Sequence, residues 1–216
     1  MKTTLAALLL LTCLHIVAQQ TPHRKENNYW SVGINPFGIV ENEAALGPCI
    51  SYRLLPHLEF WTEYAFLFNS FNSIGGWHNL SGYRFIFQPR LYFTKSSSFF
   101  IAPEFRLKHY TYNSTGNFIN SNASDTLLNY PHNVLQTLIG GALLIGSQGE
   151  LSRKHQIFLE FTIGIGYKER MVKRENVPVD YTYFYQQRHY AFTIDYEKEG
   201  NLVYIPLCLR LICKLR

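Results

Sequence analysis

Hydrophobic and polar residues alternate along eight stretches of this chain, and the connectors between the stretches are alternately long and short. A strand with one face in lipid and the other in a polar interior alternates with a period of two residues. The pattern therefore predicts an all-β fold, an eight-stranded antiparallel up-and-down transmembrane β-barrel. The predicted strands are 29–40, 45–54, 58–69, 82–94, 99–112, 133–145, 156–168 and 202–214.

The charged residues of the predicted strands share one face. In the last strand, Val203, Ile205 and Leu207 have one parity, whereas Cys208 and Arg210 have the other. An Arg or Lys that faces lipid near the middle of a bilayer costs roughly 2–4 kcal/mol. We therefore expect the charged parity to face the interior of the barrel. The predicted interior charges are Arg53, Glu59, Glu63, Arg84, Arg90, Glu104, Arg106, Glu160 and Arg210.

Opposite charges inside a narrow eight-stranded barrel should form ion pairs, because an unpaired buried charge is costly. Paired carboxylates in a cavity could instead support acid–base catalysis. A filled barrel gives a substrate little access, so a structural role is favoured, and no enzymatic activity, catalytic residue, cofactor or metal site is predicted. Counting residues away from the short turns predicts three cross-strand pairs, Arg53–Glu59, Arg90–Glu104 and Glu160–Arg210.

The first 18 residues predict a cleaved signal peptide. Lys2 provides a positive start, residues 5–11 are apolar, and Ala18 can precede a cleavage site. The apolar run is too short for a membrane-spanning helix. Cys13 leaves a lipoprotein signal as an alternative, although Thr12 before it fits such a site poorly. The predicted organisation is a signal peptide at 1–18, a short lead at 19–28 and the barrel at 29–216.

Composition adds two constraints. The formal net charge is +5, but the basic residues are scattered along the chain, which argues against nucleic-acid binding. Aromatic residues make up 16% of the chain and gather at the ends of the predicted strands, as membrane interfaces favour. Three cysteines follow the signal peptide at spacings typical of neither a disulfide framework nor a metal site. The parities of Cys49 and Cys208 would allow a disulfide between them.

The longer connectors, 70–81, 113–132 and 169–201, are predicted to lie on the outer side, where they could contact an extracellular ligand or protein. The last of them alternates well enough to form a hairpin, which leaves a ten-stranded count as an alternative. His78, His132 and His189 fall in these connectors. Scattered loop histidines are more typical of solvated side chains than of a metal site.

Three segments, 29–38, 47–52 and 204–210, resemble the small outer-membrane β-barrel proteins of Bacteroidota. The nearest group is the uncharacterised domain family DUF3575, with related OmpA-like and porin-like barrels. The resemblance implies a location in the cell outer membrane, with outer-membrane lipid and the outer-membrane assembly machinery as partners. It implies no reaction and no cofactor. Members of this group usually end on an aromatic residue, whereas this chain ends Leu215-Arg216.

The predicted function is that of an outer-membrane barrel without enzymatic activity, with a structural or surface-interaction role through its long loops. One alternative is a small passive porin-like channel, for which the excess of interior bases would favour anions. Another is a soluble exported barrel of lipocalin type that binds an apolar ligand. That fold requires apolar residues inside and polar residues outside, the reverse of the predicted polarity.

Overall fold

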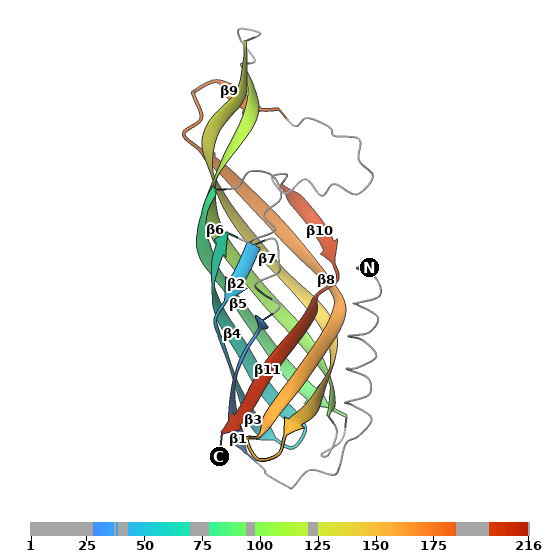
Figure 1. The fold of residues 1–216 in the computed structure, drawn as a ribbon. Helices are drawn as coiled ribbons and strands as arrows, with labels where there is room; N and C mark the ends of the chain where they lie inside the picture. The colour runs from blue at the N-terminus through green and yellow to red at the C-terminus, as the bar shows by residue number, and fades with distance from the viewer. Residues whose placement is uncertain are drawn as a thin grey trace, which may run out of the picture.

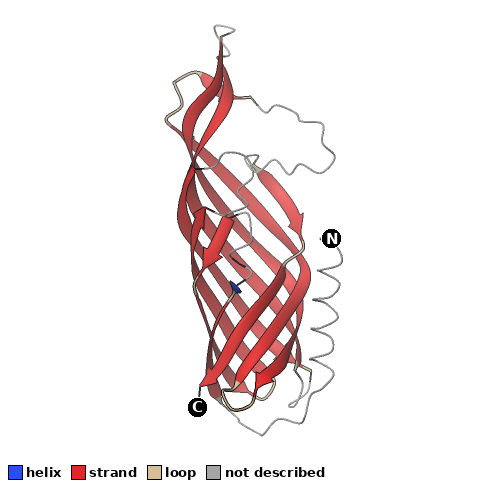
Figure 2. Cartoon of the chain, viewed as in Figure 1, coloured by secondary structure: helices blue, strands red, loops and turns tan. Residues whose placement is uncertain are grey.

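The computed structural model describes residues 28–36, 38, 43–69, 78–93, 98–120, 125–184 and 199–215. The predicted signal peptide lies outside the described residues. Regular structure in the described part is almost entirely β-strand (Figure 2), and no helix there is long and apolar enough to cross a membrane. The strands are β1 (Tyr29–Ile34), β2 (Glu43–Leu46), β3 (Pro48–Leu55), β4 (Leu58–Asn69), β5 (His78–Tyr92), β6 (Phe99–Asn120), β7 (Thr126–Ser152), β8 (Ile157–Glu175), β9 (Tyr181–Tyr183), β10 (Gly200–Tyr204) and β11 (Leu207–Leu215).

Eight of these strands form a closed antiparallel ring (Figure 1). Their order is β8-β11-β1-β3-β4-β5-β6-β7, and β7 pairs with β8 to complete the ring. β2 pairs with β4 and β10 pairs with β8, while β9 pairs with the far end of β6. The prediction of an all-β fold with eight antiparallel strands is confirmed. Among the described residues the ring closes with eight strands, and β9, part of the hairpin that the ten-stranded alternative adds, pairs at Phe118–Asn120 of β6 and does not enter the ring. The second segment of that hairpin, 190–196, lies outside the described residues.

Several strands extend beyond their predicted bounds. The predicted strand 58–69 coincides with β4, but β6, β7 and β8 all continue past the predicted ends. The connector 113–132, predicted as a loop, is largely a β6–β7 hairpin that projects beyond the ring (Figure 1). Burial still alternates there, with Asn113 exposed and Ser114 buried. The prediction failed because the exposed face becomes polar in this part, and the contrast between apolar and polar positions disappears.

Three predicted strands are broken or shortened. The strand 45–54 is interrupted at Gly47, where a side chain would collide with the β4 backbone at Tyr64 and Ala65. The strand 202–214 is interrupted next to Pro206, which has no N–H to donate to a ladder. The strand 29–40 ends at Ile34 and is followed by a turn in which the Gly38 N–H donates to the Asn35 carbonyl at 3.2 Å. Residues 37, 39 and 40 lie outside the described part.

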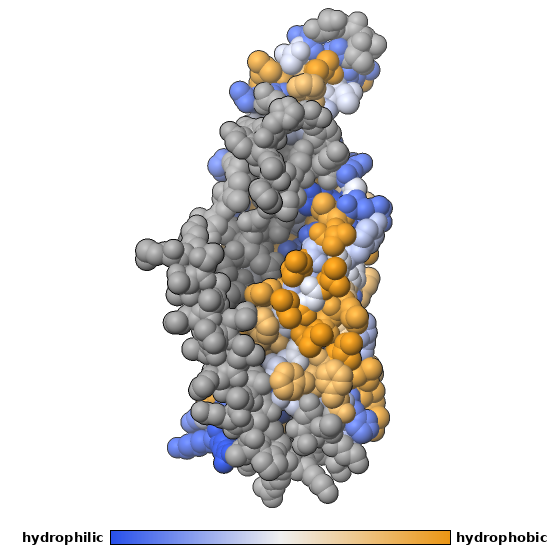
Figure 3. Space-filling model, turned by 90° about the vertical axis from the view of Figure 1, so that its right-hand side faces the viewer, coloured by the Kyte–Doolittle hydropathy of each residue, from blue (hydrophilic) through white to orange (hydrophobic). Residues whose placement is uncertain are grey.

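The two faces of the ring differ in polarity as predicted. Glu160 and Arg210 are 0% and 1% exposed on the inner face, whereas Ile165 and Val203 on the outer face are 63% and 72% exposed. On the side shown in Figure 3, hydrophobic residues form a broad area between hydrophilic ends. The sheet therefore encloses ionic groups and presents apolar groups outward.

Gly47→Ala should destabilise the fold by about 1–3 kcal/mol, because the added methyl group would meet the β4 backbone. Unfolding in urea, followed by far-ultraviolet circular dichroism, measures the change. Gly141→Ala is the matched control, since Gly141 is exposed and its nearest obstacle is the Glu104 carbonyl at 3.1 Å. Equal unfolding midpoints for the two variants would contradict the close approach at Gly47.

Candidate functional site

The centre of the interior is an ion cluster around Glu160 of β8. Arg90, from β5 on another side of the ring, donates to both carboxylate oxygens at 2.8 Å. Arg210 of β11 donates at 2.6 Å, and the Gln148 amide donates at 3.0 Å. The side chains of the ionic members are 0–1% exposed. One carboxylate thus pairs with two guanidinium groups, and it also accepts a hydrogen bond from Gln148.

Trp61 provides an aromatic surface for the same cluster. The guanidinium carbon of Arg210 lies 4.0 Å from the Trp61 ring centroid, and that of Arg90 lies 4.9 Å from it. Arg90 also forms an ion pair with Glu59 at 3.5 Å. Cation–π contacts are strongest where the cation is desolvated. The indole therefore compensates part of the cost of burying two positive charges beside each other.

Two further groups of interacting acidic and basic side chains lie next to the central cluster. Arg84 forms a buried ion pair with Glu63 on the neighbouring strand, with its Nε donating at 2.9 Å. Glu104 accepts from the Gln88 amide at 2.6 Å and from Arg106 Nε at 2.9 Å. Gln88 also accepts from Arg90 at 3.1 Å, which connects this group to the central cluster.

The predicted partners Arg53 and Glu59 are opposite each other in the strand register, but they do not form an ion pair. The two residues face each other on β3 and β4, but Arg53 donates to the Tyr29 hydroxyl at 3.1 Å and to the Pro56 carbonyl. The Arg53 guanidinium lies 3.9 Å from the Tyr92 ring centroid, and the Tyr92 hydroxyl donates to Glu59. Tyr92 therefore lies between the predicted partners.

The other two predicted pairs have opposite outcomes. Glu160 and Arg210 are cross-strand partners in the register of β8 and β11, and their side chains form the predicted ion pair. The pair Arg90–Glu104 is not formed, because Arg90 reaches across the interior to Glu160 and Gln88 lies between Arg90 and Glu104. Counting from a turn identifies neighbours on adjacent strands, but it cannot identify a partner across the ring.

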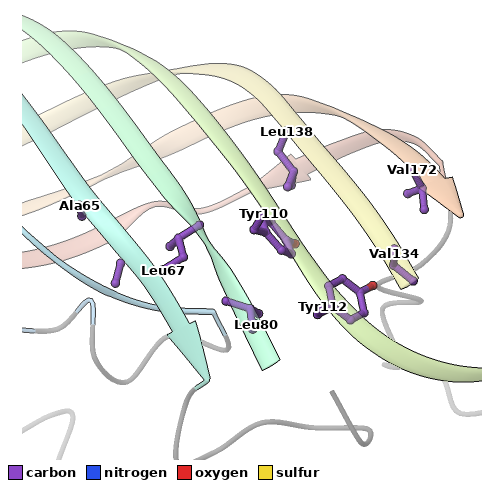
Figure 4. Packing of buried hydrophobic residues seen from close by; sticks show 9 residues of the cluster. Ala65, Leu67, Leu80, Tyr110, Tyr112, Val134, Leu138 and Val172 are labelled. Atoms are coloured by element: carbon purple, nitrogen blue, oxygen red, sulfur yellow. The ribbon is translucent and has the colours of Figure 1, made fainter. Parts of the chain in front are cut away.

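An apolar cluster occupies the interior nearer the long connectors (Figure 4). Its side chains come from several strands around the ring and converge on one region, with Leu67 from β4, Tyr110 from β6 and Leu138 from β7 among them. Their exposed fractions are all below 9%. The Tyr110 hydroxyl donates to the Gln136 side-chain oxygen, which satisfies the Tyr110 phenol within this cluster. On this side, an apolar layer therefore lies next to the charged layer.

The projecting hairpin carries a small aromatic cluster on its inner face. Phe118 of β6 makes edge-to-face contacts with His132 at 5.0 Å and Tyr183 at 5.3 Å between ring centroids. Nearby, the Tyr181 hydroxyl donates to Asp125 at 2.7 Å, and this hydrogen bond raises the pKa of the Tyr181 phenol above its usual value. These contacts attach β9 to the hairpin and give the projection a third strand.

The remaining candidates do not form a reactive site in the described residues. Cys49 and Cys208 are both buried, and no disulfide joins them. His132 packs in the aromatic cluster, His78 is exposed at the start of β5, and His189 lies outside the described part. Within the residues that the structure describes, no group of three His, Cys, Asp or Glu side chains is arranged to hold a metal ion.

Sequence reasoning missed the neutral residues that complete the charge network. Gln88, Gln148, Trp61 and Tyr92 each contact a predicted charge, and all four are buried. Alternation along the strands could have identified these residues as inward-facing. Trp61 shares the face of Glu59 and Glu63, and the other three lie on buried positions of their own strands. Comparison of the chain with protein-family models, curated proteins and solved structures finds no match.

Glu160→Gln should destabilise the protein by about 3–5 kcal/mol, because Arg90 and Arg210 would stay buried without their shared carboxylate. Urea unfolding again measures the change. Glu175→Gln is the control, since its pair with Lys173 is formed by side chains that are 48% and 69% exposed and should contribute at most about 1 kcal/mol. Similar losses in both variants would contradict a central role for Glu160.

Proposed function

We propose that this protein is an outer-membrane β-barrel without enzymatic activity. In this proposal the ring spans the cell outer membrane, and the β6–β7 hairpin with β9 presents a surface for interaction outside the cell. Outer-membrane lipid surrounds the ring, and the outer-membrane assembly machinery inserts it. The role is structural or one of surface interaction, and the extracellular ligand or protein partner is unidentified.

The polarity of the closed ring carries the proposal. Charged side chains such as Glu160, Arg90 and Arg210 are at most 1% exposed inside, while large apolar side chains are exposed outside. Leu143 and Ile145 of β7 are examples, with exposed fractions of 52% and 56%. A soluble protein would bury such side chains, whereas a lipid environment accepts them. Ring strands such as β4 and β5, with 12 and 15 residues, are long enough to cross the hydrocarbon layer.

The alternative of a lipocalin-type barrel fits this polarity poorly, because such a fold needs an apolar cavity and a polar exterior. The buried Glu160 cluster lies where an apolar ligand would have to bind. A passive channel is also less well supported. The central side chains pair across the interior, and the apolar cluster adds a layer that would exclude hydrated ions.

Heat-modifiable migration on a gel and recovery in outer-membrane fractions are the expected results for the proposed barrel. A soluble monomer that remains in solution without detergent would overturn the proposal.

Leu143→Arg should cost about 2–4 kcal/mol in vesicles, because Leu143 lies on the outer face between the exposed residues Pro103 and Ile165 of its neighbouring strands. Thr115→Arg is the control, at an exposed position of the projecting hairpin beyond the ring, and should change the stability by less than about 0.5 kcal/mol. Urea unfolding in phosphatidylcholine vesicles measures both. In a water-exposed barrel the two substitutions would be equally mild, and that result would exclude a lipid-facing Leu143.

Planar-bilayer recordings should give a flat current for the inserted wild-type protein, since buried ion pairs and a buried apolar cluster lie within the described ring. Reproducible unitary current steps that select anions would favour the channel alternative instead. A parallel recording with a known porin confirms that the bilayer can report conductance.

A further inference from the structure

The outer face of β6 changes from apolar to polar part of the way along the strand. Its outward positions from Phe99 to Leu107 are all apolar, whereas Thr111, beyond His109, is polar and exposed. The neighbouring strand β5 shows the same change. Its outward positions from Phe93 to Phe85 are apolar, and Ser81, nearer the long connectors, is polar and exposed. Two adjacent strands therefore lose their apolar outer face at one level.

The residues at this level form a row across the sheet. Tyr83 pairs with His109, and His109 pairs with Thr137 of β7. The ring centroids of Tyr83 and His109 are 5.5 Å apart, and His109 Nδ1 lies 2.9 Å from the Thr137 hydroxyl oxygen. We refer to Tyr83, His109 and Thr137 as the boundary row. On β8 the change comes at the exposed residue Glu169.

The inner face changes polarity in the opposite sense at the same level. Arg84 of β5 and Lys108 of β6 are buried cross-strand partners, and they are the last inward Arg, Lys, Asp or Glu of these strands in their described parts. Beyond them the interior holds the apolar cluster of Figure 4, with Tyr110 and Tyr112 from β6. On β8, Arg174 is an exception, and its guanidinium carbon lies 4.0 Å from the centroid of an aromatic ring of β9.

The two parts of the wall have the polarities that two different solvents require. Toward the short turns, ionic groups lie inside and apolar groups lie outside, which suits a lipid environment. Toward the long connectors, apolar groups lie inside and polar groups lie outside, which is the arrangement of a protein in water. The inner and outer faces therefore indicate the same boundary by opposite changes.

The apolar band below the boundary row has the height of a hydrocarbon layer. Phe99 and His109 are ten residues apart on β6, which corresponds to roughly 33 Å along a strand at about 3.3 Å per residue. At a strand tilt of roughly 40°, this length gives a band about 25 Å tall, as in outer-membrane barrels. β6 then continues for eleven more residues to Asn120, so a comparable length of strand lies beyond the boundary row.

We propose that the headgroup layer of the membrane meets the ring at the boundary row. This inference rests on the proposed membrane function. Tyr83 and His109 contact the lipid headgroups, because aromatic side chains with a polar edge are favoured at a membrane–water interface. Only the wall below them lies in lipid, and the parts of β5 to β8 beyond them are surrounded by water. The apolar cluster is then the core of the water-exposed part of the wall.

Site-directed spin labelling of the refolded protein in phosphatidylcholine vesicles tests the boundary. Oxygen concentrates in lipid and a nickel chelate remains in water, so the ratio of their collision rates with a nitroxide reports its depth. The ratio should fall steeply from position 105 to position 111 and pass through its midpoint at position 109. The label is attached on the outer face of β6 at Phe105→Cys, His109→Cys or Thr111→Cys, in a background with Cys49→Ala, Cys208→Ala and Cys213→Ala.

Thr115→Cys in the projecting hairpin is the matched reference for water, since Thr115 is an exposed residue of the same strand. A label at Thr111 should be as accessible to the chelate as the label at Thr115. If the label at Thr111 were as shielded as the label at Phe105, the membrane surface would lie higher, and the boundary would be overturned. Phe85→Cys and Ser81→Cys repeat the comparison on β5, so the test does not depend on one variant folding.

Heat-modifiable migration of each labelled variant, measured first, identifies the variants that are folded. If a folded variant labelled at Phe105 is as accessible to the chelate as one labelled at Thr115, the ring does not lie in lipid and the proposed membrane function itself fails. If the labels at Phe105 and Thr111 are both shielded, the membrane function stands and only the boundary fails.

Discussion

The pairing of buried charges governs the rest of this structure. An ionised side chain excluded from water is tolerated only when a counter-charge and hydrogen bonds replace its hydration. Glu160 meets this requirement for two arginines at once, and Gln148 and Trp61 complete their surroundings. Because every partner must come from the inner face, the requirement fixes which residues of each strand point inward. The outer face then receives the apolar residues by alternation.

The charge network also connects opposite sides of the interior. Arg90 is long enough to span from β5 to Glu160 on β8, and Tyr92 connects Glu59 with the guanidinium of Arg53. The Arg90–Glu160 ion pair and the contact of Arg53 with Tyr92 join strands that are not neighbours in the sheet. The backbone ladder holds adjacent strands together, whereas the side-chain network holds the ring together across its interior.

The fold was largely predictable from the sequence because alternation encodes which face a residue occupies. The parity of Arg84, Glu160 and Arg210 was sufficient to place them inside. Strand ends were less predictable. At Thr111 and beyond, the outer face becomes polar, so hydrophobic contrast no longer marks the strand. The break at Gly47 depends on a local steric constraint, and the break at Pro206 depends on a missing N–H donor. The pattern of hydrophobic and polar positions reveals neither.

The partners inside the ring were only partly predictable. Glu160 and Arg210 lie on adjacent strands at matching register, so a local count found them. Arg90 and Glu160 are 70 residues apart and meet only because the sheet closes. Neutral residues such as Gln88 carry no charge signal, yet Gln88 accepts from Arg90 and donates to Glu104. The closure of the ring and the neutral residues that bridge charged side chains depend on the three-dimensional structure, so they cannot be predicted from each strand separately.

The position of Arg210 on β11 affects how the ring can close. β11 is the strand that joins β8 to β1. Until this strand docks, Glu160 lacks one of its two arginines and the sheet has open edges. A sheet with the other seven strands in place would therefore still hold an incompletely paired carboxylate. Docking of β11 completes the ion pairs and the backbone pairing in one step, which makes closure of the ring cooperative.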